Sequence, residues 1–282
     1  MRIHLCGVRG STPVSGPEFL RYGGNTSCVV VSSGDEPPRL ILDAGTGLLR
    51  AVPLFADTPF RGALLLTHLH WDHTQGLPFF PPADNPGAAV ELFAPGESDV
   101  AGALERMMSP PNFPITPSQL RGEWHFKNLE EGAHEIQGYS VLAKLVPHKG
   151  GQTFGYRISD GLTSLAYVSD HCPAGLGPGP DGVGEYHGPI LELVDGVDVL
   201  IHDAQYTLEE FPAKAHFGHS VADYAVRLAI RAGVSRVVLF HHDPFHDDAK
   251  VDEILAHCRE IAKESPLLVD AASDGLVIET SG

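Results

Sequence analysis

Short apolar runs, most of them closed by a polar residue, recur along the chain and predict buried β-strands. Residues 62–66 read GALLL, and comparable runs occupy 139–147, 164–169 and 236–240. An apolar run of this length, bounded by turn residues, is typical of a strand covered on both faces. Residues 247–263 instead repeat their apolar positions every three or four residues, which predicts an outer helix. The pattern as a whole predicts an α/β protein.

The first of these runs is followed by four side chains that commonly bind metals. His68, His70, Asp72 and His73 fall within six positions directly after it. In an extended continuation of the strand, His68 and His70 point to the same side because side chains alternate with period two. The chain then turns, so Asp72 and His73 can face a neighbouring position. This spacing predicts two adjacent metal ions that share one loop, whereas a loop of solvated histidines would have no reason to alternate in this way.

Three further candidate ligands stand where other predicted strands end. They are His148, Asp170 and His241, each of which follows an apolar run. An α/β scaffold exposes its functional groups at strand ends. Taken singly, each residue has a plain alternative as a solvated loop histidine or a turn aspartate. His242 is a rival for His241, because adjacent residues alternate in direction.

The H-x-H-x-D-H pattern of residues 68–73 resembles the signature of the metallo-β-lactamase superfamily, and the later candidates follow in the superfamily's order. The resemblance implies an αβ/βα sandwich, two mixed sheets covered by outer helices, with residues 1–282 forming one hydrolase domain. It also implies two divalent metal ions, for which zinc suits the imidazole and carboxylate ligands and manganese or iron would also fit. The implied ligands are His68, His70 and His148 for one ion, Asp72, His73 and His241 for the other, and Asp170 between them.

Two later segments resemble the tRNase Z branch of this superfamily. Residues 201–205 (IHDAQ) resemble its H-E-A-T segment, and residues 218–220 (GHS) resemble its H-S-T segment. In that branch a carboxylate orients a histidine, which protonates the leaving oxygen of a phosphodiester. The resemblance assigns these roles to Asp203 and His219, with an aspartate whose reach is one methylene shorter than that of glutamate. The alternative is that His219 merely precedes a helix cap formed by residues 220–223.

The resemblance extends over residues 2–247 and includes phosphoribosyl cyclic phosphodiesterases and cyclic-nucleotide phosphodiesterases. Residues 40–47 match the superfamily's first motif, in which Asp43 would support the metal loop through hydrogen bonds. The implied function is hydrolysis of a small phosphodiester, such as a cyclic nucleotide or a cyclic ribose phosphate, with Asp72, Asp203 and His219 as catalytic residues. The alternatives are tRNA 3′-end processing, hydrolysis of a lactone, thioester or β-lactam, and metal-dependent binding without catalysis.

Charge argues for a small substrate. The net charge of −17, from 36 acidic and 19 basic residues, would repel a polyanion such as tRNA. Residues 173–189 are rich in glycine and proline and contain no Lys or Arg, so they predict a surface loop rather than a tRNA-gripping arm. The proline-rich apolar segment 107–115 predicts either a flap that shapes a pocket for a base or aryl group, or a packed surface loop.

The remaining expectations concern the protein's surroundings. The chain has no run of eighteen apolar residues and no basic-then-apolar leader, so we expect a soluble cytoplasmic protein without a membrane partner. Its four cysteines lack metal-type spacing, which favours reduced thiols. The apolar segment 107–115, together with the habit of the resembled family, raises the expectation of a homodimer.

Overall fold

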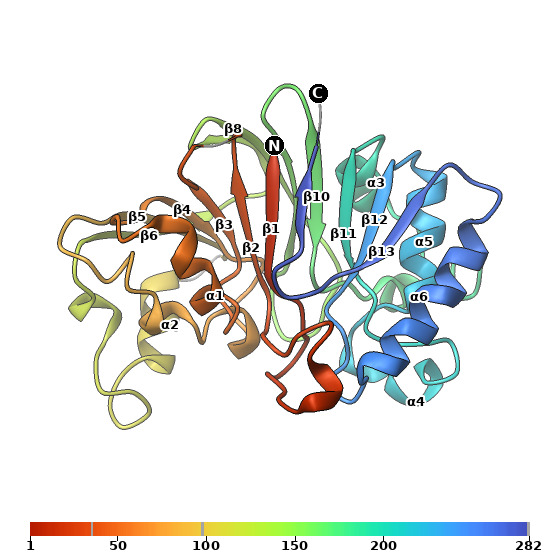
Figure 1. The fold of residues 1–282 in the computed structure, drawn as a ribbon, viewed down its shortest axis with the longest axis horizontal. Helices are drawn as coiled ribbons and strands as arrows, with labels where there is room; N and C mark the ends of the chain where they lie inside the picture. The colour runs from red at the N-terminus through yellow and green to blue at the C-terminus, as the bar shows by residue number, and fades with distance from the viewer. Residues whose placement is uncertain (35, 97–98, 281–282) are drawn as a thin grey trace.

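Two facing β-sheets form the centre of the molecule (Figure 1). The computed structural model describes residues 1–282 except 35, 97–98 and 281–282. The first sheet has the order β14 (Val277–Glu279), β1 (Arg2–Gly7), β2 (Cys28–Ser32), β3 (Leu40–Leu42), β4 (Arg61–Leu65), β5 (Ala89–Pro95), β6 (Glu123–Leu129). The second has the order β13 (Leu268–Ala271), β12 (Arg236–Phe240), β11 (Val199–Asp203), β10 (Ser164–Val168), β9 (Phe154–Ser159), β8 (Tyr139–Leu145), β7 (Gly132–Ile136). Both sheets combine parallel and antiparallel pairs.

Helices cover the outer face of each sheet (Figure 1). The first sheet is flanked by α1 (Leu48–Ala51) and α2 (Val100–Met107), and the second by α3 (Gly188–Val194), α5 (Ala222–Arg231) and α6 (Asp248–Ala262). The short helix α4 is Phe211–Lys214. The 3-10 turns are η1 (Pro17–Phe19), η2 (Val52–Phe55), η3 (Trp71–His73), η4 (Leu77–Phe79), η5 (Pro117–Gln119), η6 (Pro173–Leu176) and η7 (Ala215–Phe217).

Three layers of buried apolar side chains hold these elements together. The central layer lies between the sheets and includes Leu65 from the first sheet and Ile201 from the second. One outer layer packs α3, α5 and α6 against the second sheet, with Leu228 and Ile254 among its members. The other outer layer packs α1 and α2 against the first sheet. The predicted αβ/βα sandwich with two mixed sheets is therefore confirmed.

The elements predicted from apolar patterns lie close to their predicted positions. Strand β12 coincides with the run at 236–240, β4 is shifted from its run by one residue, and β8 and β10 end two residues and one residue before theirs. Helix α6 lies within the predicted 247–263 and is one residue shorter at each end. The helix cap predicted at 220–223 is wrong. Helix α5 starts at Ala222 after an uncapped Val221, because the Ser220 hydroxyl donates instead to the carbonyl of His171 at 2.8 Å.

The carboxyl ends of β10, β11 and β12 lie at one edge of the second sheet, because these strands are parallel. Strand β4 of the first sheet brings its own end to the same edge. Two hydrogen bonds from β9, which pairs with β10, join the two sheets there: the Phe154 amide donates to the Thr67 carbonyl at 2.9 Å, and the Tyr156 hydroxyl donates to the Leu66 carbonyl at 2.6 Å. The loop that follows β4 is thus fixed between the two sheets.

Two further properties of the described residues concern their helices and their cysteines. None of their helices is long and apolar enough to span a membrane. All four cysteines are free thiols.

Candidate metal centre

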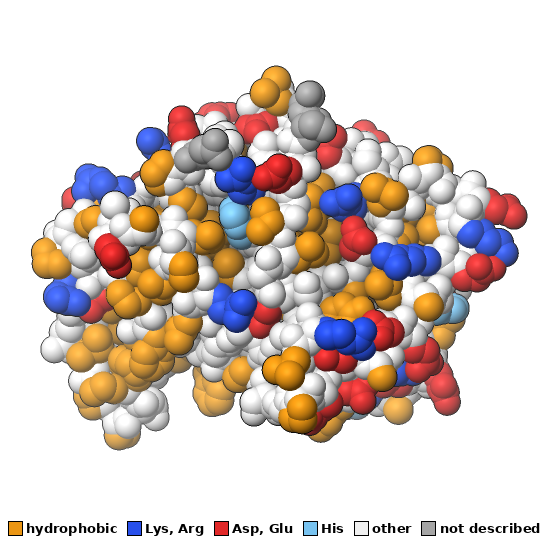
Figure 2. Space-filling model, viewed as in Figure 1, with side chains coloured by type: hydrophobic (Ala, Val, Ile, Leu, Met, Phe, Trp, Pro, Cys, Tyr) orange, Lys and Arg blue, Asp and Glu red, His pale blue; other side chains and the backbone are white. Residues whose placement is uncertain are grey.

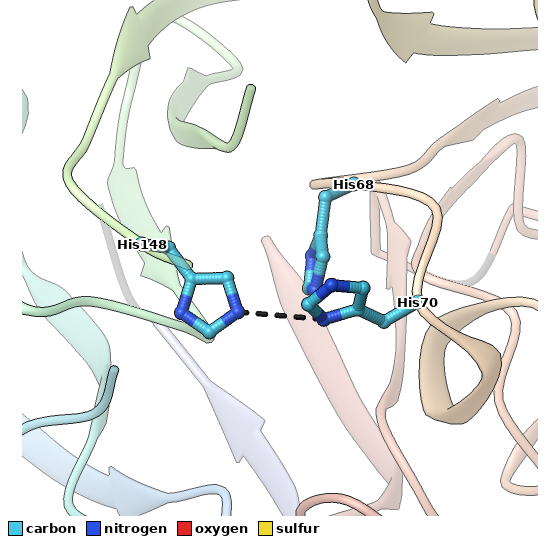
Figure 3. A group of neighbouring side chains, drawn as sticks. All are labelled: His68, His70 and His148. Carbon is cyan, nitrogen blue, oxygen red and sulfur yellow. Dashed lines mark hydrogen bonds between the residues drawn. The ribbon is translucent and has the colours of Figure 1, made fainter. Parts of the chain in front are cut away.

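Three histidines gather at this edge from two loops (Figure 3). His68 and His70 extend from the loop after β4, and His148 comes from the loop after β8. Their ligand atoms all lie within 4.8 Å of one another. His148 Nε2 is 3.4 Å from His70 Nδ1, and the dashed line in Figure 3 joins these two nitrogens.

A second group lies beside the first and is more deeply buried. Asp72 and His73 belong to the 3-10 turn η3 in the same loop, and His241 follows β12. Asp72 Oδ2 is 3.3 Å from His73 Nε2 and 3.2 Å from His241 Nε2. All three side chains are buried.

Asp170, after β10, lies between the two groups. One of its oxygens, Oδ1, is 3.1 Å from His73 Nε2 and 3.4 Å from His241 Nε2. The other, Oδ2, is 3.5 Å from His148 Nε2 and 3.9 Å from His68 Nε2. The structure thus brings together all seven predicted ligands, called the seven-residue cluster below: His68, His70, Asp72, His73, His148, Asp170 and His241. That they bind metal remains a prediction.

The cluster has the chemistry of a cation site. His68 Nε2, His73 Nε2 and Asp170 Oδ1 are buried without a hydrogen-bond partner, although they face one another. A buried polar atom without a partner costs about 1–3 kcal/mol, so such atoms normally have one. Imidazole nitrogens and carboxylate oxygens gathered in this way are the donor set that binds zinc and related divalent ions. The residues present therefore fit a pair of divalent ions.

The charges within the cluster favour positive charge at its centre. Burial raises the pKa of Asp170, but the neighbouring histidines, His241 first, outweigh it and hold the pKa well below its ordinary value. The pKa of Asp72 is lowered in the same way by His73 and His241. Burial lowers the pKa of His73, yet Asp72 and Asp170 outweigh burial and raise it well above its ordinary value. Burial keeps the pKa of His68 low, so this imidazole is neutral, the form that binds a metal ion.

Hydrogen bonds outside the cluster fix which ring nitrogen of each histidine points inward. The His73 Nδ1–H donates to Asp43 at 2.8 Å, and Asp43 also accepts from the Thr67 amide at 2.7 Å. His148 Nδ1 donates to the carbonyl of Gly218 at 2.7 Å, and His241 Nδ1 to the side-chain oxygen of Gln205 at 3.1 Å. Such contacts orient metal ligands and set their tautomers. The supporting contact expected of Asp43 is present.

The structure separates the rivals His241 and His242. His241 has a left-handed φ of 60°, and its Nε2 faces Asp72 and Asp170. His242 points away, and its Nε2 donates to the carbonyl of Ala272 at 2.9 Å. The geometry therefore favours His241 as the candidate ligand.

Asp203 and His219 lie next to the cluster and contact each other. His219 Nδ1 donates to Asp203 Oδ2 at 3.0 Å, so the shorter aspartate does reach the histidine. The same oxygen accepts from the amides of His171 at 3.0 Å and Ser220 at 3.2 Å. The His219 ring stacks on that of His241, with centroids 4.9 Å apart. Asp203 is thus held by the backbone, and His219 is held by Asp203.

The N-terminal loop contacts the seven-residue cluster, which the sequence did not predict. The amide of Ser11 donates to Asp72 Oδ2 at 2.7 Å. A Cβ at Gly10 would lie 2.4 Å from His241 Nδ1, so only glycine lets this loop approach the cluster. The fully buried Arg9 anchors the loop by donating to the carbonyls of Gly23 at 2.8 Å and His246 at 2.6 Å. Gln205 was also missed. Ser11 and Gln205 lie in segments that resemble the family, but no local pattern reveals the residues to which they are hydrogen-bonded.

A family model described as "Beta-lactamase superfamily domain" matches residues 38–242, a range that contains the seven-residue cluster. The chain belongs to the β-lactamase superfamily. It is a hydrolase of the metallo-β-lactamase fold, and fold and cluster together imply that it binds divalent metal. The family match ends at His242, one residue after His241, the last histidine of the cluster.

Individual relatives are distant. A ribonuclease Z from Anoxybacillus flavithermus is 24% identical over 253 residues, which cover 76% of this chain and 79% of that protein. Among solved structures, the metallo-β-lactamase fold protein YhfI from Bacillus subtilis has a TM-score of 0.72 at 17% identity and covers 99% of this chain and 98% of its own. A diphosphatase from the PhnP family has a TM-score of 0.70 at 20% identity with the same coverage. The two structures establish the shared fold.

Proposed function

We propose that the protein is a dinuclear metal-dependent phosphodiesterase that hydrolyses a small phosphodiester. The observation that carries the proposal is the Asp203–His219 pair beside the seven-residue cluster, because phosphodiester cleavage needs a proton donor for the leaving alkoxide. The names of the relatives, a ribonuclease Z and a PhnP-family diphosphatase, agree with chemistry at phosphorus. The substrates that fit best are cyclic nucleotides and cyclic ribose phosphates.

The metal ions would be held as the sequence predicts. His68, His70 and His148 form one group, Asp72, His73 and His241 form the other, and Asp170 faces both. We propose zinc, with manganese and iron as alternatives that the same donors accept. Divalent ions at these residues would supply positive charge for the phosphate oxygens and lower the pKa of water toward about 7.

His219 would act as the general acid. Its Nδ1–H is committed to Asp203, which leaves Nε2 to carry the proton for the leaving oxygen. Because Asp203 accepts from backbone amides as well, it stays in place while His219 gains and loses charge. A positioned general acid typically contributes about 10²–10⁴-fold to the rate. Hydrolysis of a lactone or β-lactam at such a cluster has less need of this donor.

A small substrate is favoured over tRNA by charge and by the shape of one loop. The chain carries a net charge of −17, which opposes binding of a polyanion. The segment at 173–189 does not extend as an arm, because the Tyr224 hydroxyl of α5 donates to the Glu185 carbonyl at 2.9 Å and Tyr186 stacks on Tyr224. tRNA 3′-end processing remains the second candidate function, favoured by the ribonuclease Z relatives.

The proposal is tested with a substrate panel on metal-loaded full-chain protein. The panel contains 2′,3′- and 3′,5′-cyclic nucleotides, a precursor tRNA and a chromogenic β-lactam. We expect hydrolysis of cyclic diesters that stops on chelation, with little cleavage of the tRNA. Salt-sensitive cleavage of the precursor tRNA without diester hydrolysis would favour the second function. Hydrolysis of the β-lactam alone would reject both.

A further inference from the structure

A large cavity opens beside the first histidine group. It has a volume of about 1410 Å³, and His68 and His70 form part of its wall. Leu69 and Trp71 contribute from the same loop, while Met107 and Phe113 contribute from the end of α2 and the segment after it. Typical small-molecule sites measure about 300–1,000 Å³, so the space can hold a group larger than a phosphate. The segment 107–115 thus lines a cavity that reaches the cluster.

The walls of this cavity are largely apolar. Among its described lining residues, Arg106 is the one Lys, Arg, Asp or Glu side chain. Figure 2 shows hydrophobic side chains gathered at the lower left, over α2 and the segment that follows it in Figure 1. A wall with one cation offers little to the phosphates of a polynucleotide, whose binding depends on many Lys and Arg contacts. It suits an uncharged group instead.

Exposed aromatic rings line the cavity. Trp71 is 75% exposed and Phe79 is 54% exposed, although both have large apolar side chains. Phe79 meets Phe113 edge to face, with ring centroids 5.7 Å apart. Exposed apolar side chains that line a cavity mark a place where a ligand covers them. The amino groups of Gln75 and Asn112 in the same wall donate to Thr26 and to the Arg106 carbonyl, and their side-chain oxygens can accept from the polar edge of a ring system.

We propose that this cavity binds an uncharged aromatic ring system, such as a nucleobase, on one ester arm of the substrate. The inference rests on the proposed phosphodiesterase function, with the phosphate at the seven-residue cluster and the ring between Phe79 and Trp71. It separates two substrates that the cluster alone does not distinguish. A diester that carries a base is preferred to a cyclic ribose phosphate without one.

The test is calorimetric titration of the zinc-loaded full chain with methyl-, phenyl- and 2-naphthylphosphonate. These ligands share one head group, and hydrolysis does not break their P–C bond. Because buried apolar area strengthens binding, we expect the naphthyl compound to bind at least about tenfold more tightly than the methyl compound. Phe79→Ala and Phe113→Ala should lose most of this preference and keep the affinity for methylphosphonate. Leu162→Ala, which removes an 81% exposed side chain from the turn between β9 and β10, is the matched control and should change nothing.

Equal affinity of the wild type for the three phosphonates would overturn the inference. So would light scattering that finds a dimer in the wild type and a monomer in Phe113→Ala, because a second copy would then cover this surface. Hydrolysis of bis(p-nitrophenyl) phosphate by the same sample separates the two proposals. Hydrolysis with equal phosphonate affinities rejects the aromatic site alone. A graded series without hydrolysis of any diester rejects the phosphodiesterase function alone.

Discussion

The Nδ1–H of His219 donates to Asp203 Oδ2 over 3.0 Å, although the two residues are sixteen positions apart. Backbone pairing brings them together. The Tyr206 amide, three residues after Asp203, donates to the Ser220 carbonyl at 3.1 Å, and the Ala222 amide donates to the Tyr206 carbonyl at 2.9 Å. Because the loop is held this closely to the end of β11, a carboxylate with one methylene fewer than glutamate still reaches the imidazole.

Replacing His219 tests its role as proton donor. We expect His219→Ala to lower kcat for a diester with a poor leaving group by about 10²–10⁴-fold. Zinc content, measured by plasma mass spectrometry, should stay at the wild-type value, because the seven-residue cluster is intact. Loss of zinc from this variant would refute the assignment and place His219 among the ligands.

Removing Asp170 should lower the zinc content as well as the activity. This carboxylate contacts both groups of the cluster, so Asp170→Ala should lose bound zinc and diesterase activity together. Asp84→Ala, which removes a partly exposed carboxylate paired with Arg121, is the control and should keep both. An Asp170→Ala protein that retains two zinc ions would show that Asp170 does not bind metal.

Gln205 tests whether the orientation of His241 contributes to metal affinity. Its side-chain oxygen accepts from His241 Nδ1, so Gln205→Ala frees that ring to rotate. Loss of such an outer contact typically costs about 10–100-fold in metal affinity, which competition with a chromophoric chelator measures. Gln137→Ala, which removes an amide paired with Glu91 away from the cluster, is the matched control. Unchanged zinc affinity in Gln205→Ala would show that this contact does not support metal binding.

Glu210 should make stability depend on pH. Burial raises its pKa, but hydrogen bonds from His246 and Thr207 outweigh burial and lower the pKa from 4.5 to about 2. A carboxylate with a lowered folded-state pKa stabilises the fold above its unfolded pKa, and this stability is lost as pH falls toward the folded value. Because the group is partly exposed and screened, we expect Glu210→Gln to cost about 1 kcal/mol at pH 7.

That cost should fade between pH 4.5 and about 2, where Glu210 becomes protonated in the folded protein. Urea unfolding of metal-free wild type and Glu210→Gln at pH 7 and pH 3 measures it. A difference in unfolding free energy that is the same at both pH values would contradict the role given to this carboxylate.

Local patterns predicted the parts of the site that are local in sequence. The histidines of residues 68–73 and the strand ends before His148 and Asp170 are visible in runs of a few residues. The choice between His241 and His242 was not visible in such a run, because the alternation of side chains along a strand stops where φ turns positive at His241. The capping pattern at Ser220 failed because a tertiary partner, the carbonyl of His171, took its hydroxyl.

Contacts between distant segments lay beyond local patterns. Ser11 donates to Asp72 across 61 positions, and Gln205 accepts from His241 across 36. Such pairs depend on the order of the strands within each sheet, which no short window of sequence contains. The apolar segment 107–115 did indicate a pocket as one alternative, but no local pattern indicated that the metal loop forms its other wall.

Metal-dependent phosphodiesterase activity is measured by p-nitrophenol release from bis(p-nitrophenyl) phosphate by zinc-loaded full-chain protein, before and after chelation. We expect steady hydrolysis by the loaded protein, none after chelation, and recovery when zinc is returned. Protein that holds two zinc ions per chain and releases no p-nitrophenol would contradict this expectation.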